Sequence, residues 1–136
     1  MRISKKGLYA LKAMLVLAKN SPTRMTKIHE IAARENIPEK FLELILLDLK
    51  RARLVDSQRG ARGGYRLRRP ARRIFLGEIV RTIDGPLAPF GDAELLRRLV
   101  ARDKKDRAIY RLFLEVRNAA ARIMDHTSLA DLCARR

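Results

Sequence analysis

Residues 26–69 read TKIHEIAARENIPEKFLELILLDLKRARLVDSQRGARGGYRLRR, and this stretch decides the fold. From Thr26 to about Asn36 apolar residues recur at helical spacing, and Pro38 suits the first position of a second helix that runs to about Ala52. The apolar residues of this second helix fall within one narrow arc: Leu42, Ile45, Leu46 and Leu49. Two short helices joined by a tight turn predict a helix-turn-helix.

In the remainder of the stretch the spacing of the apolar residues changes from helical to alternating. Two segments, 54–59 and 65–69, flank the glycine-rich connection Gly60–Gly64, and Tyr65–Arg68 alternates apolar with basic residues. Alternation beside such a connection is typical of a β-hairpin, and its outward face would be almost purely arginine. A hairpin directly after a helix-turn-helix is the wing of a winged-helix domain. The alternative is an ordinary hairpin whose glycines serve only the turn.

Upstream, residues from Ser4 to Lys19 predict a helix with Ser4 as its N-cap. The face expected to point inward carries Leu8, Leu11, Leu15 and Ala18. Downstream, Asp92 can cap a short helix, and Ser128 with Asp131 offers a capping arrangement for a last one. These features predict a mostly α protein with one small β-hairpin.

Charge indicates the kind of partner. The chain has 136 residues, with 31 Lys or Arg against 15 Asp or Glu and a formal net charge of +16. The densest part, Lys50 to Arg73, carries ten basic residues and a single acidic one, Asp56. Such a field favours polyanions, above all nucleic acid, although a solvated basic face is the simpler alternative. The chain lacks a membrane-length apolar run and a signal-peptide pattern, so we expect a soluble, cytoplasmic protein with no membrane partner.

In addition, the chain resembles the Rrf-two (Rrf2) family, which comprises bacterial winged-helix transcription regulators that act in iron–sulfur, nitric-oxide and cysteine metabolism. The resemblance spans nearly the whole chain and is carried by Met1-Arg-Ile-Ser4, Lys6-Gly7, Tyr9-Ala10, Ile31-Ala32, Phe41-Leu-Glu43, Leu54-Val55, Arg59-Gly60, Gly63–Leu67, Leu76–Val80, Asp84–Leu87 and Thr127–Leu132. It implies a winged helix-turn-helix DNA-binding domain over residues 1–85. Residues 86–136 would then hold a linker with a short helix, a long dimerisation helix and a C-terminal helix.

Family members form dimers through a long helix after the winged domain, and residues from about Asp106 to Asp125 offer a candidate. Its apolar residues, spaced three and four apart, would form a seam for the partner helix. The seam residues are Ile109, Leu112, Phe113, Val116, Ala120 and Ile123. The alternative is a core helix folded back on its own domain.

The predicted DNA contacts fall into three groups. On the second helix of the helix-turn-helix, the major-groove face holds Lys40, Phe41, Glu43, Leu44, Leu47 and Arg51. On the wing, contacts to the minor groove and its phosphates come from Arg59, Arg62, Gly63 and Gly64. At the N-terminus of the first helix, donors for a phosphate are Ser4, Lys5 and Lys6.

Two of these positions depart from the family pattern. By resemblance, Glu43 matches a residue that the family uses for base selection. Phe41 stands where relatives often have Tyr, and Leu44 where some have Gln. Leu44 cannot form the paired hydrogen bonds to adenine that a Gln could form. The operator sequence of a relative therefore cannot be assigned to this protein.

A further departure concerns iron. Iron–sulfur members usually have three cysteines between Gly85 and the dimerisation helix, and this segment has no Cys or His here. One cysteine, Cys133, cannot fill the usual four positions of a cluster, even with its dimer mate. The sequence therefore predicts no metal and no cofactor. The signal would be a small-molecule or protein effector, and the leucine stripe Leu95–Val100 would pack on the dimerisation helix or line a small apolar pocket.

Other functions remain open at this stage. A basic RNA-binding protein would explain the charge, but only 5% of residues are aromatic. A regulator controlled by an enzyme partner is a second alternative. An enzyme is not expected, because no nucleophile–base pair, metal-binding carboxylate cluster or P-loop is present.

Overall fold

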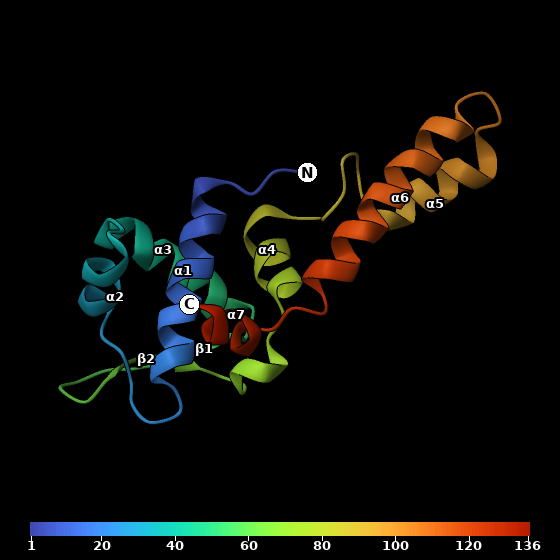
Figure 1. The fold of residues 1–136 in the computed structure, drawn as a ribbon. Helices are drawn as coiled ribbons and strands as arrows, with labels where there is room; N and C mark the ends of the chain where they lie inside the picture. The colour runs from blue at the N-terminus through green and yellow to red at the C-terminus, as the bar shows by residue number, and fades with distance from the viewer.

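A computed structural model describes residues 1–136 and is mostly helical, with one two-stranded antiparallel hairpin (Figure 1). The predicted fold class, mostly α with a small hairpin, is therefore confirmed. The elements are α1 (Lys5–Asn20), α2 (Ile28–Glu35), α3 (Glu39–Arg51), β1 (Val55–Gln58), β2 (Gly64–Leu67), the 3-10 helix η1 (Ala71–Arg73), α4 (Leu76–Asp84), α5 (Ala93–Arg102), α6 (Arg107–Met124) and α7 (Leu129–Arg135).

Helix α1 lies at the centre of the winged part, in contact with α2, α3, α4, α7 and β2. Its predicted N-cap is confirmed, because the Ser4 hydroxyl accepts a hydrogen bond from the Gly7 amide at 3.0 Å. The predicted inward face is correct in part: Leu11, Leu15 and Ala18 are half-buried and pack against the core, whereas Leu8 is exposed. The fully buried residues include Ala10, Ala13, Met14 and Leu17. The two alanines let the neighbouring elements approach this central helix closely.

Helix α2 begins at Ile28, two residues later than the predicted start at Thr26. Thr26 is instead fully buried and pairs with Tyr65 on the hairpin through two backbone hydrogen bonds of 2.8 Å each. The backbone at Thr26 is therefore extended rather than helical. Thr26 thus forms an isolated antiparallel bridge to β2, beside the two strands of the wing.

Helix α3 carries the predicted inward face, and this prediction is confirmed. Its four buried residues are Leu42, Ile45, Leu46 and Leu49. Pro38 caps the helix rather than opening it. The turn before it contains Asn36, whose φ of 54° ends α2 in the left-handed region.

The hairpin pairs Val55 with Leu67 and Gln58 with Gly64. Val55 and Leu67 are buried, while Arg66 and Arg68 face outward, as the alternation predicts. The outward face is less purely basic than predicted, because Asp56 lies on it and forms a 3.6 Å ion pair with Arg68.

Helices α5 and α6 form an antiparallel helical hairpin that projects away from the winged part (Figure 1). Asp92 caps α5 by accepting from the Leu95 amide at 2.8 Å, as predicted. Leu96 is fully buried, and α5 packs along α6, which is one of the two arrangements that the leucine stripe predicts. The alternative of an α6 folded back on its own domain is wrong.

After α6 the chain returns to the winged part. The predicted capping box is present, since Ser128 and Asp131 exchange hydrogen bonds of 2.9 and 3.1 Å. Leu129 is fully buried in the same core as α1, so α7 packs with residues from the first half of the chain.

Candidate DNA-binding surface

The outer face of α3 is the first part of the candidate surface. Five predicted contact residues are exposed on it: Lys40, Glu43, Leu44, Leu47 and Arg51. Leu44 is 58% exposed and Leu47 42%, so no element of the chain covers either side chain. One face of one helix thus presents cations, a carboxylate and two leucines to the exterior.

Phe41 borders this face and is half-buried. Its ring meets the ring of Tyr9 edge to face, with centroids 5.6 Å apart. The Lys5 ammonium lies 5.8 Å from the centroid of the Tyr9 ring. Phe41 therefore joins α3 to the N-terminal part of α1 and places the exposed Lys5 near the α3 face.

The tip of the wing carries the second part. Arg59 and Arg62 are exposed and form no ion pair within the chain. The tip is closed by a hydrogen bond from the Gly63 amide to the Gly60 carbonyl at 3.0 Å. Two arginines that have no internal partner are thus held on an ordered turn.

The two glycines at the base of the tip have a structural role of their own. A Cβ at Gly63 would collide with the Gln58 backbone, and one at Gly64 would lie 2.5 Å from the Thr26 carbonyl oxygen. Gly64 also has a φ of +136°, which L side chains rarely adopt. The packing of the wing therefore requires glycine at both positions.

The N-terminus of α1 is the third predicted part, and its donors are already engaged. Asp84 accepts hydrogen bonds from the Ser4 amide at 2.9 Å and from the Ser4 hydroxyl. Lys6 forms a 2.8 Å ion pair with Asp48. Of the three predicted residues, Lys5 has the most exposed charge.

Two lysines beside this surface were not among the predicted contacts. The Lys27 ammonium donates to the Gly60 carbonyl at 2.5 Å, and the Lys50 ammonium donates to the Ser57 hydroxyl at 2.6 Å. Lys50, near the end of α3, and Lys27, the residue before α2, thus connect these helices to the hairpin and add positive charge beside it. The run of basic residues from Lys50 onward was the only sequence signal for Lys50, and none indicated Lys27.

The predicted seam lies on the projecting helix α6. Four of its residues form an exposed apolar stripe: Ile109 (50%), Leu112 (56%), Val116 (43%) and Ile123 (60%). Ala120 is half-buried. Phe113 lies at the border of the stripe, because its ring contacts the ring of Phe90 at a centroid distance of 6.3 Å.

Comparison with known proteins agrees with this architecture. The profile of the Rrf2 family, described as an iron-dependent transcriptional regulator, matches residues 3–135. The chain belongs to the Rrf2 family. An rrf2-like HTH-type transcriptional regulator of Rhodobacter capsulatus is 41% identical over 97% of this chain and 92% of that protein. The HTH-type transcriptional regulator CymR of Bacillus subtilis is 36% identical over 98% of this chain and 91% of that protein.

The solved structure of CymR, the global cysteine regulator of Bacillus subtilis, superposes with a TM-score of 0.85. It covers 100% of this chain and 98% of the CymR chain at 34% identity. The Rrf2 fold therefore extends over the whole length, including the α5–α6 hairpin and α7. These relatives are named as regulators of transcription, which is a role without catalysis.

The family description names iron, yet the donor set of this Rrf2 chain does not fit an iron–sulfur cluster. Cys133 lies on α7, and its thiol donates to the Leu15 carbonyl of α1 at 3.8 Å. Burial raises the pKa of this thiol, which disfavours the thiolate that binds iron. No group of three or more His, Cys, Asp or Glu side chains lies together in a way that could hold a metal ion.

None of the helices is both long enough and apolar enough to cross a membrane.

Proposed function

We propose that this Rrf2 protein is a cytoplasmic homodimer that represses transcription by binding a palindromic operator in double-stranded DNA. The observation that carries the proposal is the uncovered face of α3. It combines side chains that read bases with side chains that neutralise phosphates, next to a wing tip whose arginines have no internal partner. In this proposal residues 1–85 form the DNA-binding domain and residues 86–136 supply the dimer contact, with α7 packed back on the winged part.

The α3 face would enter the major groove, whose width admits a helix. Lys40 and Arg51 would bind phosphates or guanine edges, and Glu43 would accept from a cytosine amino group. Leu44 and Leu47 would contact thymine methyl groups. Phe41 would position the helix through its contact with Tyr9.

The wing would reach the adjacent minor groove with Arg59 and Arg62. Gly63 and Gly64 would contribute by allowing the backbone to approach the DNA. At the start of α1, Lys5 would bind a phosphate directly. Ser4 and Lys6 would do so only by exchanging their bonds to Asp84 and Asp48.

Dimerisation would bury the exposed stripe of α6 against a second copy. The contact residues would be Ile109, Leu112, Phe113, Val116, Ala120 and Ile123. A two-fold axis would place the two α3 helices about 34–36 Å apart, at successive major grooves of a palindrome. We propose repression because occupying an operator needs no contact beyond these surfaces, whereas activation requires a further contact with the polymerase.

The first test removes the wing arginines. Arg59→Ala and Arg62→Ala should each weaken binding to duplex DNA and reduce the salt slope of log K by about one. Fluorescence anisotropy across a salt series measures this, using a duplex that the wild-type protein selects from genomic fragments. Arg98→Ala is the matched control, because Arg98 is exposed on α5, outside the proposed surface.

Equal salt slopes for all three variants would contradict the wing contact. A structured RNA competes in the same assay. Displacement of the duplex by that RNA at equal concentration would favour the RNA-binding alternative.

A further inference from the structure

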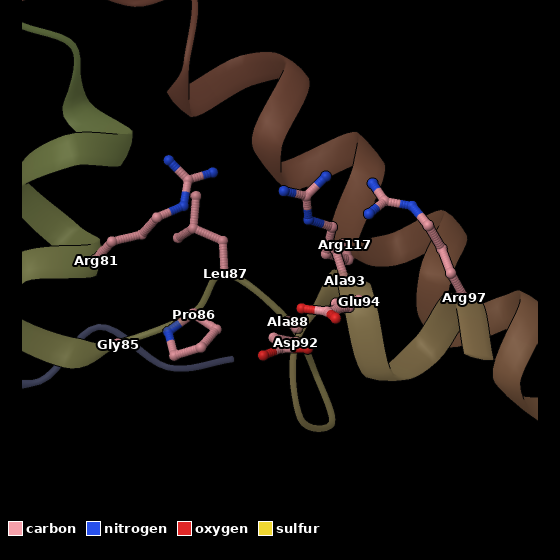
Figure 2. Close-up of a pocket in the computed structure, with 10 residues that line it drawn as sticks. All are labelled: Arg81, Gly85, Pro86, Leu87, Ala88, Asp92, Ala93, Glu94, Arg97 and Arg117. Atoms are coloured by element: carbon pink, nitrogen blue, oxygen red, sulfur yellow. The ribbon is translucent and has the colours of Figure 1, made fainter. Parts of the chain in front are cut away.

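A cleft lies where the α5–α6 hairpin joins the winged part. Its volume is about 460 Å³, and Figure 2 shows the residues that line it. One wall comes from the end of α4 and from the segment Gly85–Ala88. The other wall comes from the start of α5 and from Arg117 on α6. The leucine stripe of α5 does not line a small apolar pocket here, because the residues of α5 that face this cleft are mostly charged.

Three arginines from three different helices meet at the cleft: Arg81 of α4, Arg97 of α5 and Arg117 of α6. In Figure 2 their guanidinium groups lie at a similar height, above the segment Pro86–Asp92. Arg81 is compensated, since it donates two hydrogen bonds of 2.7 and 2.8 Å to Asp125. Arg97 and Arg117 form no ion pair, although Arg117 donates a 3.2 Å hydrogen bond to the side-chain oxygen of Asn118.

Two carboxylates also line the cleft, and Figure 2 draws them below the three guanidinium groups. Asp92 is engaged as the cap of α5. Glu94 is exposed and forms no ion pair. The cleft therefore offers two guanidinium groups that lack an ion-pair partner, with planar donors that match carboxylate and phosphate oxygens.

We propose that this cleft binds a small dianionic metabolite, through oxygens of a phosphate or a pair of carboxylates, and that Arg97 and Arg117 are its principal ligands. Two guanidinium groups without an ion-pair partner match two negative charges, and the cleft volume lies within the range of small-molecule sites. Leu87 and Ala88 would contact the carbon part of the ligand.

The position of the cleft links ligand binding to DNA binding. The cleft lies between the winged part and the α5–α6 hairpin, and the relative orientation of these two parts would set the spacing of the α3 helices in a dimer. Gly85, with a φ of +81°, and Pro86 connect these parts directly. A ligand held from both walls would favour one orientation and so change the affinity for the operator. This regulatory step rests on the proposed function, whereas binding of the anion does not.

Calorimetry of the full chain without DNA tests the binding step. The probes are sodium phosphate and sodium succinate, with sodium chloride at equal ionic strength as the reference. We expect saturable binding of one of the two anions, and its identity separates a phosphate ligand from a dicarboxylate. Arg97→Gln and Arg117→Gln should each weaken binding about tenfold or more, since each removes a charge-assisted hydrogen bond. Arg98→Gln, next in the chain but outside the cleft, should bind like the wild type.

Two further measurements complete the test. Glu94→Gln should bind the anion more tightly, because it removes a carboxylate that lines the cleft without an ion-pair partner. Anisotropy with duplex DNA, at constant ionic strength, should reveal an anion-dependent shift in wild-type affinity that Arg117→Gln lacks. No saturable binding of either anion, or an equal loss in Arg98→Gln, would overturn the site. Anion binding without an effect on DNA would overturn the regulatory step alone, and absence of DNA binding would instead refute the proposed function.

Discussion

At the scale of single residues, Leu44 is the most informative side chain of the candidate surface. A leucine that is 58% exposed in the middle of a polar helix face gains nothing from solvent. The chain itself does not cover it. A thymine methyl group in the major groove is a partner of the right chemistry.

Leu44→Ala should therefore weaken binding to a duplex selected by the wild-type protein. The expected loss is about 1 kcal/mol, roughly fivefold in Kd, because only part of the side chain would be buried against a methyl group. Replacing thymine by uracil in the duplex removes that methyl group and should weaken the wild type by a similar factor. The variant should not respond to this replacement. A variant that loses affinity again on the uracil duplex would show that Leu44 acts elsewhere.

Cys133 is a residue whose surroundings make its side chain less reactive. Burial raises the pKa of the thiol, and Arg136 and Lys19 lower it by smaller amounts. At neutral pH the thiolate fraction is therefore below that of a free cysteine. This environment favours a packing role over a redox sensor.

At the scale of elements, periodicity predicted what depends on neighbours in the chain. The inward face of α3, the hairpin, the Ser4 cap and the extent of α6 all follow from local spacing and capping, and all were correct. The errors arise where distant segments meet. Thr26 is extended because it pairs with Tyr65, and α1 turns its alanines inward because five elements surround it.

The residues of the candidate sites were likewise predictable only where they lie on one element. The helical periodicity of α3 identified its exposed face, since all the residues of that face belong to one helix. The arginine cleft could not be predicted, because Arg81, Arg97 and Arg117 are far apart in sequence and meet only through the packing of α4, α5 and α6. The engagement of Ser4 with Asp84 was missed for the same reason.

One ion pair joins the ends of two of these elements and gives a prediction about pH. Arg81 of α4 donates to Asp125 at the end of α6, and this hydrogen bond is the main cause of the lowered pKa of Asp125. A group whose pKa is lower in the folded state stabilises the fold above its unfolded pKa, here about 3.8. That contribution is lost as the pH falls through the lower, folded pKa.

Asp125→Asn should therefore lower the Tm by a few degrees at pH 7, with a smaller difference from the wild type below about pH 4. Differential scanning calorimetry at both pH values measures this. Glu115→Gln is the matched control, because it removes an exposed charge from the same helix without breaking an ion pair. Equal Tm losses for the two variants at pH 7 would mean that the Arg81–Asp125 pair does not stabilise the junction.

At the scale of the whole molecule, the projecting α5–α6 hairpin poses a physical problem that a second copy would solve. The hairpin projects from the winged part (Figure 1), and its stripe of Ile, Leu and Val residues is left exposed by the rest of the chain. Such a stripe at spacings of three, four and seven is typical of helices that pair. The same pairing would supply the two-fold axis that a palindromic operator requires.

The last prediction tests this assembly with Val116→Asp. Val116 is 43% exposed in the single chain, so the variant should fold, with a helical circular dichroism spectrum like that of the wild type. A buried, unpaired carboxylate in the seam should oppose pairing, and light scattering should report monomers. Asn118→Asp introduces the same carboxylate at an exposed position off the stripe and should remain dimeric. Since a monomer binds only one half-site, Val116→Asp should lose roughly 10²-fold or more in affinity for the full palindrome, with little change for an isolated half-site. A folded Val116→Asp dimer of normal mass would place the interface on another surface.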